Sequence, residues 1–283
     1  MTSRNLAVLG HPIDHSLSPV LHAAAYDVLG LDWAYGRQDL TADKLDDYVS
    51  SRDETWVGLS LTMPLKYRAA ELADVVDEAT ALTGACNTLV FDHDTNRLNG
   101  FNTDVPALAS VITDVSDGTP ASVSIVGGGA TAVSAVVAAA RAGAQSVDLY
   151  LRDTNKASNA IAAAQASSIS LSVHPLDQFS REVPRGISVV TLPGGVDIAL
   201  PASGLAHSVL LDVAYSPWPT ARAQAWDASG GLTVGGLHML VRQALLQVRA
   251  FVTGSPQVSL DREDEVLSAM AKSLGLSEIF DDS

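Results

Sequence analysis

The chain has 283 residues, of which 47% are hydrophobic and 17% are charged, so it can form packed cores in two ordinary domains or one large one. Its net charge of −15, with no cluster of Lys and Arg, argues against a nucleic-acid partner and against a membrane-surface partner. The apolar runs are far shorter than the roughly 20 residues that a membrane span needs, and the N-terminus lacks the features of a signal peptide, so we expect a cytoplasmic protein.

Strand-like and helix-like patterns alternate through the first hundred residues. Short apolar segments at 6–9, 33–38 and 58–62 read as strands. Helical patterns occupy 19–29, 42–51 and 67–73, and Ser18 is a plausible N-cap for the first of them. This order predicts an α/β domain with a largely parallel sheet.

A second pattern begins after a boundary near Asp104. A helix is expected over 106–113, followed by a turn-rich loop at 114–120. The segments that follow are typical of a doubly wound nucleotide-binding domain. Its expected strands are 122–126, 146–151, 187–191 and 209–213, its helices run to Arg141 and over 157–166, and two final helices cover 237–252 and 262–274.

A glycine turn joins the first strand of this second pattern to its long helix. Gly127-x-Gly129-x-x-Ala132 follows a short apolar strand and opens a helix, as the dinucleotide fingerprint requires. Glycines let the backbone approach a pyrophosphate, and the helix N-terminus supplies N–H groups and the positive end of a dipole. We therefore expect a nucleotide here; the alternative is a tight turn without a ligand.

Two cations and one acid follow the next strand. Arg152 and Lys156 suit the 2′-phosphate of NADP, and Lys156 is one of only four lysines in the chain. Asp153 instead favours NAD, because an acid at this position would bind the ribose hydroxyl of that cofactor. The alternative without a ligand is a solvated polar loop. We favour NADP because the segment has two cations that could bind its phosphate and only one anion that would favour NAD.

Polar residues also stand at the ends of apolar segments in the first half of the chain. Lys66 follows Thr62 and a proline just past a strand, where an ammonium can donate a proton to a ketone oxygen as hydride arrives. Asn87 and Asp104 lie at the ends of later segments, and Asp104 is a candidate partner for Lys66. Taken singly, these residues are more often surface charges, caps or turn formers.

The segment 10–19 carries two histidines and two serines. No carboxylate or cysteine lies near the histidines at ligand spacing, so we expect no metal. Ser16 and Ser18 either cap the next helix or donate hydroxyls to a ligand carboxylate. The single cysteine, Cys86, excludes an internal disulfide, and we expect it to be a small buried side chain.

Together these segments resemble the shikimate dehydrogenase family over nearly the whole chain. The matching motifs share the family's order and spacing. They are G-x-P-I-x-H-S-x-S-P at 10–19, T-x-P-x-K at 62–66, G-A-x-N-T-L at 84–89, G-x-N-T-D at 100–104, the glycine turn at 127–132, the segment around Tyr215, and G-L-x-M-L-V-x-Q at 236–243.

The resemblance implies an N-terminal α/β substrate domain at 1–104, a Rossmann-like NADP-binding domain at 105–236, and C-terminal helices at 237–283 that return to the substrate domain. It implies that a small ring acid binds in the cleft between the domains. Ser16 and Ser18 would hold its carboxylate, while Thr62, Asn87 and Gln243 would hold hydroxyl groups, with Tyr215 nearby. Lys66 and Asp104 would form the catalytic pair. The cofactor would be held by Gly127, Gly128, Gly129, Ala130, Arg152, Lys156 and Gly236.

The implied activity is the reversible reduction of 3-dehydroshikimate to shikimate with NADPH, by a monomer or a homodimer. Some positions depart from the family pattern, notably 191–194 (TLPG), which replaces a common N-A-T-S segment beside the nicotinamide, and Ser60, which stands where Asn is common. Two alternatives stay open: a quinate/shikimate paralogue that prefers NAD, and a non-catalytic nucleotide sensor on the same fold.

Overall fold

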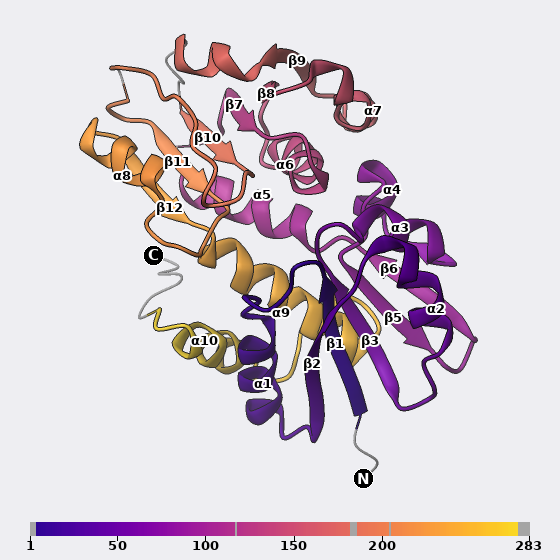
Figure 1. The fold of residues 1–283 in the computed structure, drawn as a ribbon. Helices are drawn as coiled ribbons and strands as arrows, with labels where there is room; N and C mark the ends of the chain where they lie inside the picture. The colour runs from indigo at the N-terminus through magenta and orange to yellow at the C-terminus, as the bar shows by residue number, and fades with distance from the viewer. Residues whose placement is uncertain (1–3, 117, 182–185, 204, 277–283) are drawn as a thin grey trace. The chain divides into compact units, whose positions relative to one another are not determined.

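A computed structural model describes residues 4–116, 118–181, 186–203 and 205–276. The described chain divides into two compact units (Figure 1). The first consists of residues 4–103 together with 241–276, and the second of Asp104–Leu240. No helix in the described part of the chain combines the length and the apolar character needed to cross a membrane.

The first unit contains a six-stranded sheet in the order β2-β1-β3-β5-β6-β4. Its first three strands are parallel, β5 runs antiparallel to both β3 and β6, and β4 pairs in parallel with β6. The sheet is therefore mixed rather than largely parallel, because a hairpin follows the initial β-α-β-α run. The strands are β1 (Arg4–Gly10), β2 (Trp33–Asp39), β3 (Trp56–Leu61), β4 (Val75–Val76), β5 (Thr88–Asp92) and β6 (Arg97–Phe101).

Side chains alternate along β3 between the two faces of this sheet. Leu59 and Leu61 belong to the core beneath α2 and α3. On the opposite face Gly58 lies against the ring of Phe251 from α9, where a larger side chain would not fit. Helices α1 and α10 pack together, as Figure 1 also shows. The helical segments are α1 (Ser18–Leu29), a 3₁₀ turn (Ala42–Lys44), α2 (Leu45–Ser50), α3 (Lys66–Leu72), α4 (Glu78–Thr83), α9 (Leu237–Thr253) and α10 (Glu263–Ser273).

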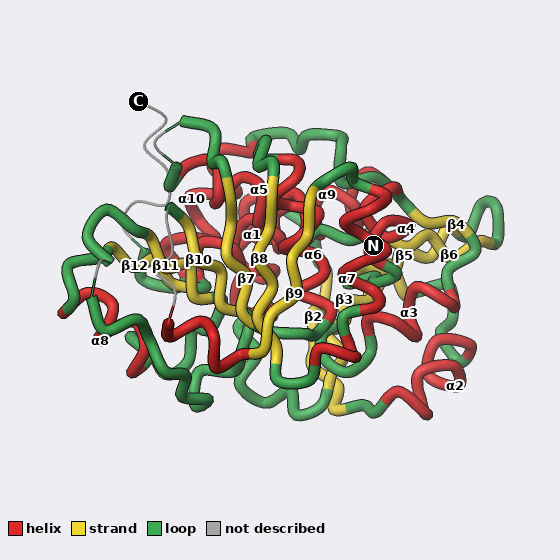
Figure 2. Tube along the Cα trace, turned by 90° about the horizontal axis from the view of Figure 1, so that it is seen from above, coloured by secondary structure: helices red, strands yellow, loops and turns green. Residues whose placement is uncertain are grey.

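The second unit contains an all-parallel sheet in the order β12-β11-β10-β7-β8-β9, seen as a row of strands in Figure 2. The chain goes from β7 outward to β9 and then returns to β10 on the other side of β7. The order in which strands are added to the sheet thus reverses direction between the paired strands β7 and β10. The strands are β7 (Ser122–Val126), β8 (Ser146–Leu151), β9 (Ser170–Pro175), β10 (Ile187–Val190), β11 (Val209–Asp212) and β12 (Leu232–Gly235).

Buried aromatic and aliphatic side chains form the core on one side of this sheet. Trp226 and Phe179 stack at 6.5 Å between ring centroids and pack with Val126, Val190 and Leu210 from the strands. The alanine- and valine-rich α6 has small side chains, which let it pack closely with α5. The helical segments are α5 (Asp104–Asp114), α6 (Ala130–Arg141), a 3₁₀ turn (Thr154–Lys156), α7 (Ser158–Ala166), a 3₁₀ segment (Leu176–Arg181) and α8 (Ala221–Ala228).

The α/β fold class expected from the sequence is confirmed by this architecture and by the structural relatives described below. The sequence patterns nevertheless missed the β5–β6 hairpin, the edge strands β9 and β12, and helix α8. The expected helix over 42–51 is a 3₁₀ turn followed by the short α2.

Candidate functional site

Ser16 and Ser18 lie between the end of β1 and the first turn of α1. Both are buried, at 6% exposure each, and the backbone N–H of Ser18 donates to the Ser16 hydroxyl at 3.4 Å. The expectation that Ser18 caps the helix is wrong: the N-cap is Leu17, with no side-chain cap, and Ser18 is the first helical residue. Pro19 can follow it there because the first helical turn needs no N–H from that position.

Lys66 begins α3, one tight turn after β3 ends. The N–H of Leu65 donates to the Thr62 carbonyl at 2.8 Å, which closes the turn between the strand and the helix. The Lys66 carbonyl accepts from the N–H of Cys86 at 2.9 Å, so the segment leading to Asn87 lies directly beside Lys66. Cys86 is buried as expected, and burial raises the pKa of its thiol to about 12, which leaves it an unreactive core residue.

Asn87 is the centre of a buried polar cluster. Its side-chain N–H donates to the Thr103 hydroxyl at 2.9 Å and approaches the Gln243 amide oxygen at 3.5 Å, while its own amide oxygen accepts from the Thr103 N–H at 2.9 Å. Gln243 comes from α9, 156 residues further along the chain. Asp104, 3% exposed, is the next residue after Thr103 and begins α5. The chain thus brings Asn87 and Gln243 together and places Asp104 one peptide bond from a residue bonded to Asn87.

A buried network behind this cluster was missed from the sequence. Tyr35 donates to the Ser60 hydroxyl at 2.6 Å, and Ser60 donates to the Gln247 amide oxygen at 3.0 Å. Gln247 in turn donates to the Asn87 carbonyl at 3.1 Å. The ring of His22 stacks on Tyr35 at 3.9 Å between centroids. The signal in the sequence was Gln247, which lies one helical turn after Gln243 in the expected helix 237–252.

Burial fixes the protonation states in this network. It lowers the pKa of His22 to about 3, against a hydrogen bond with Gln247 that favours the charged form. Burial also raises the pKa of Tyr35 well above its usual value, and hydrogen bonds with Ser60 and Ser18 oppose the shift. At neutral pH the imidazole is therefore uncharged and Tyr35 keeps its proton as a donor.

In the second unit the glycine turn lies at the carboxyl end of β7. Gly127 has a φ of 136°, and a Cβ there would overlap the hydroxyl of Thr191, so both conformation and space require glycine. At Gly129, the N-cap of α6, a Cβ would have nothing within 4 Å. The first N–H groups of a helix have no intrahelical partner, so Gly128, Gly129 and Ala130 can present theirs to an anion in that open space.

The basic segment follows β8, the strand next to β7. Arg152 and Lys156 are both exposed. Lys156 ends a 3₁₀ turn, two residues before α7 begins at Ser158. The Asp153 carboxylate accepts from the N–H of Asn155 at 3.2 Å and caps this turn. Asp153 thus has a structural partner, and the two cations flank it in the chain.

Tyr215 and Gly236 occupy the loops after β11 and β12. Tyr215 is half-buried. A Cβ at Gly236 would overlap the Val213 carbonyl oxygen, so this glycine permits a close backbone approach between the two loops. Because all six strands are parallel, these loops and the glycine turn emerge from the same edge of the sheet, where open α/β sheets bind ligands.

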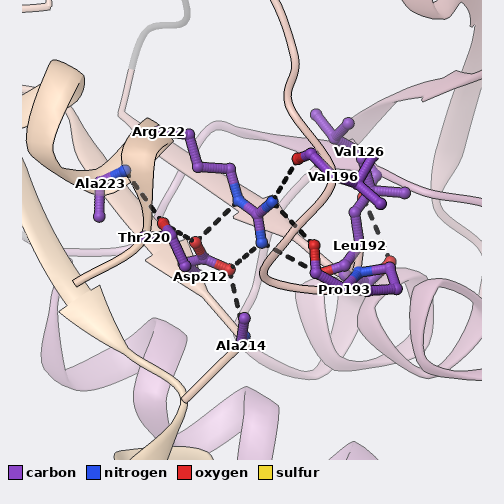
Figure 3. A network of polar contacts seen from close by, with 10 residues as sticks. Val126, Leu192, Pro193, Val196, Asp212, Ala214, Thr220, Arg222 and Ala223 are labelled. Atoms are coloured by element: carbon purple, nitrogen blue, oxygen red, sulfur yellow. Dashed lines mark hydrogen bonds and ion pairs between the residues drawn. The ribbon is translucent and has the colours of Figure 1, made fainter. Parts of the chain in front are cut away.

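A buried ion pair at this edge was also missed. Asp212 ends β11 and binds Arg222 of α8, with both side chains almost completely buried (Figure 3). An acid within an expected apolar strand was a detectable signal; its arginine partner, ten residues later in a helix that the sequence patterns did not reveal, was not. Among the described residues, no group of three or more His, Cys, Asp or Glu side chains could hold a metal ion.

These features fit a dinucleotide in the second unit: a glycine turn with open space at Gly129, a helix N-terminus, and exposed cations after the neighbouring strand. In the first unit, the buried hydroxyl and amide groups of Ser16, Ser18, Asn87 and Gln243 suit a small ligand rich in oxygen.

Comparisons with known proteins identify the family. Residues 8–89 match the model of the shikimate dehydrogenase substrate-binding domain. A shikimate dehydrogenase (NADP(+)) of Ignicoccus hospitalis is 32% identical over 88% of this chain and 94% of its own length. The crystal structure of Mycobacterium tuberculosis shikimate dehydrogenase is 33% identical, with a TM-score of 0.79 over 95% of this chain and 99% of that one.

A second enzyme type shares the fold to a similar degree. A structure of quinate dehydrogenase from Corynebacterium glutamicum in complex with NAD is 25% identical, with a TM-score of 0.79 over 96% of this chain and 98% of that one. At nearly equal coverage, the Mycobacterium tuberculosis shikimate dehydrogenase has the higher sequence identity to this chain, 33% against 25%. This chain belongs to the shikimate dehydrogenase family.

Proposed function

We propose that this chain is an NADP-dependent oxidoreductase that interconverts 3-dehydroshikimate and shikimate, a step of aromatic amino acid biosynthesis. The observation that carries the proposal is the meeting of Asn87 and Gln243, 156 residues apart, in a chain whose other unit has a dinucleotide-type glycine turn. Family membership supplies the substrate, because relatives that match nearly the whole chain are named shikimate dehydrogenase (NADP(+)).

The first unit, by this proposal, binds the ring acid. Ser16 and Ser18 donate hydrogen bonds from their hydroxyls to its carboxylate, while Thr62, Asn87 and Gln243 hydrogen-bond its hydroxyl groups. Tyr215 is a further proposed contact of the ring acid. Support comes from burial and chemistry: Ser16, Ser18, Asn87 and Gln243 are all less than 9% exposed, and their hydroxyl and amide groups can both donate and accept hydrogen bonds. A substrate with several hydroxyl groups and a carboxylate offers donors and acceptors of the matching kind.

Lys66 and Asp104 are the proposed catalytic pair. In the reducing direction the Lys66 ammonium donates a proton to the ketone oxygen while hydride arrives at the carbon; in the oxidising direction the neutral amine takes the hydroxyl proton as hydride leaves. Asp104 hydrogen-bonds the reacting hydroxyl and stabilises the charge on Lys66. The hydrogen bond from the Cys86 N–H to the Lys66 carbonyl supports the role of Lys66, because it holds Lys66 beside the segment that bears Asn87.

The second unit holds NADP in this proposal. The N–H groups of Gly128, Gly129 and Ala130 donate hydrogen bonds to the pyrophosphate. Gly127 and Gly236, which have no side chains, let the backbone pass close to Thr191 and to Val213. Arg152 and Lys156 bind the 2′-phosphate. The nicotinamide, when bound, supplies or accepts the hydride. The protein's share is orientation, a dry site and a positioned proton donor.

A second candidate is a quinate/shikimate dehydrogenase that prefers NAD. The similarity to an NAD-bound quinate dehydrogenase favours it, and so does Asp153, an acid close to the end of β8. The Asp153 carboxylate, however, already caps the 3₁₀ turn, and two exposed cations flank it. We therefore propose NADP as the cofactor and shikimate as the preferred substrate, with the enzyme acting in the cytoplasm as a monomer or homodimer.

The test is steady-state kinetics with shikimate and quinate, each with NADP and NAD, followed by absorbance of the reduced nicotinamide. We expect the highest kcat/KM for shikimate with NADP. Equal or better use of quinate would move the protein to the second candidate. Binding of NADP without turnover of either substrate would identify a nucleotide sensor instead.

A further inference from the structure

The loop after β10 begins beside the glycine turn. The N–H of Thr191 donates to the Val126 carbonyl at 2.9 Å and its hydroxyl approaches the same oxygen at 3.2 Å, so this loop starts against the end of β7. The order in which strands are added to the sheet reverses between β7 and β10. Ligands of open α/β sheets bind in the crevice outside the strand ends at such a point. The 191–196 loop therefore lines the crevice in which we place the cofactor.

The side chain of Arg222 holds this loop. The loop has no regular secondary structure, and its Val196 is 37% exposed. Arg222 extends from the first turn of α8 and donates to the carbonyls of Leu192 at 3.0 Å, Pro193 at 3.1 Å and Val196 at 2.8 Å (Figure 3). One guanidinium thus donates hydrogen bonds to three carbonyl oxygens of a single loop.

Asp212 completes the arrangement and extends it to a second loop. Its Oδ1 accepts from Arg222 at 2.7 Å and from the N–H of Ala214 at 3.1 Å. Its Oδ2 accepts from Arg222 at 2.8 Å and from the Thr220 hydroxyl at 2.7 Å. Both charges are buried and fully hydrogen-bonded, the condition under which a buried ion pair is tolerated. Ala214 directly precedes Tyr215, so the pair joins the 191–196 loop to the loop that bears Tyr215.

We propose that Arg222 is a positioning residue for the nicotinamide cofactor: through its bonds to three loop carbonyls and to Asp212, it sets the 191–196 loop and the Tyr215 loop in one arrangement at the edge of the sheet. This inference rests on the proposed function for the identity of the bound nucleotide. Arginine suits the role because its planar fork has five donors, whereas lysine has three donors on one nitrogen and cannot serve the carboxylate and the three carbonyls together.

The test compares Arg222→Lys with Arg249→Lys. Arg249 pairs with Glu263 and donates to the Pro256 carbonyl at 3.3 Å in the first unit, so its replacement also removes a guanidinium from an ion pair that holds a backbone carbonyl. Three properties are measured: amide hydrogen exchange of 191–196 without ligand, the Kd for NADP, and kcat with the KM for shikimate.

For Arg222→Lys we expect exchange in 191–196 to accelerate at least tenfold, the Kd for NADP to rise about tenfold, and kcat to fall by a similar factor. The KM for shikimate should change less than the Kd for NADP, because Tyr215 is the only proposed substrate residue in the two loops that Arg222 holds. Arg249→Lys should lower thermal stability without changing loop exchange or the Kd for NADP. If Arg222→Lys fails to fold, Asp212→Asn keeps the side-chain shape and should change the same three properties in the same direction.

Unchanged exchange and unchanged NADP affinity in folded Arg222→Lys would overturn the proposal. Equal losses of turnover in the two lysine variants would also overturn it, because they would reflect general destabilisation. If the wild-type protein binds no NADP, the proposed function fails, and the exchange measurement still decides whether Arg222 holds the loop.

Discussion

Lys66 is the proposed proton donor; it is the first residue of α3, and its carbonyl accepts a hydrogen bond from Cys86, next to Asn87. If it transfers the proton, Lys66→Ala should lower kcat by roughly 10² to 10⁴ and change the KM for shikimate little. Lys44→Ala is the matched control, since Lys44 is an exposed lysine of the same unit and its loss should leave turnover unchanged. Turnover of Lys66→Ala within threefold of wild type would remove this residue from the mechanism.

His22 gives the folded protein a dependence on pH. Its folded pKa is lowered to about 3 by burial, whereas a histidine in the unfolded chain titrates near 6.5. Between these values the unfolded state binds one more proton than the folded state at this residue. The contribution of His22 is therefore complete above about pH 6.5, and falls by up to about 1.4 kcal/mol for each pH unit as the pH drops toward 3.

His22→Gln should remove this contribution to the pH dependence, because glutamine cannot take up the proton. Denaturant unfolding of both proteins at several pH values between 7.5 and 4.5 measures it. The free energy of unfolding of the wild type should exceed that of the variant at high pH, and the difference should shrink as the pH falls. A difference that stays constant across this range would show that His22 does not control the acid sensitivity.

At the scale of single elements, the turn between β7 and α6 separates two roles of glycine. Gly129→Ala places its methyl group in open space at a φ of −89°, so the free energy of unfolding should change by no more than about 1 kcal/mol. The methyl group would occupy the space through which the backbone approaches the pyrophosphate, and the Kd for NADP should rise at least tenfold.

Gly127→Ala should instead destabilise the protein, because its Cβ would overlap the Thr191 hydroxyl at a φ that disfavours alanine. Denaturant unfolding and NADP titration of both variants distinguish the two roles. Wild-type NADP affinity in Gly129→Ala would argue against a pyrophosphate at this turn.

The elements that the sequence predicted well are those with long, strongly periodic apolar patterns. The expected strand over 122–126 is β7 itself, and α6 ends at Arg141 as predicted. β9 and β12 were missed because they are edge strands, with a neighbour on one side only and few buried side chains to mark them. Helix α8 has only 8 residues, which is too short for a clear periodic pattern, and its N-cap, Thr220, follows a proline-rich loop.

The candidate site was predictable only where its residues stand in recognisable local motifs. The glycine turn and the motif around Lys66 are such segments. The network of Tyr35, Ser60 and Gln247, and the pair of Asp212 and Arg222, depend on contacts between segments distant in the chain. Local patterns in a single sequence do not reveal which polar side chains will meet after folding, so these contacts needed the structure.

At the scale of the whole molecule, we propose that the first compact unit binds the substrate and the second binds the cofactor. The boundary between Leu240 and Val241 lies inside α9, so Gly236, directly before this helix, and Gln243, within it, belong to different units. The expected boundary before residue 237 placed the whole helix with the substrate domain. If substrate and cofactor are recognised by separate sets of residues, selectivity for one should be independent of the identity of the other.

Cofactor selectivity provides the test of this independence. Arg152 and Lys156 are exposed and close in the chain, and each charge-assisted contact with a phosphate contributes about 1.5–3 kcal/mol. Because about 1.4 kcal/mol corresponds to a factor of ten, Arg152→Ala should lower kcat/KM with NADP by roughly tenfold to a hundredfold and change it little with NAD.

The loss should be the same factor with shikimate as with quinate, because mutational effects at independent sites add in free energy. Arg181→Ala, which removes an exposed arginine of the same unit that pairs with Asp177, should leave the NADP-to-NAD ratio unchanged. An equal loss with both cofactors would show that Arg152 does not recognise the 2′-phosphate. A loss that differs between shikimate and quinate would instead show that the cofactor end of the molecule influences substrate choice, and that the two units do not select their ligands independently.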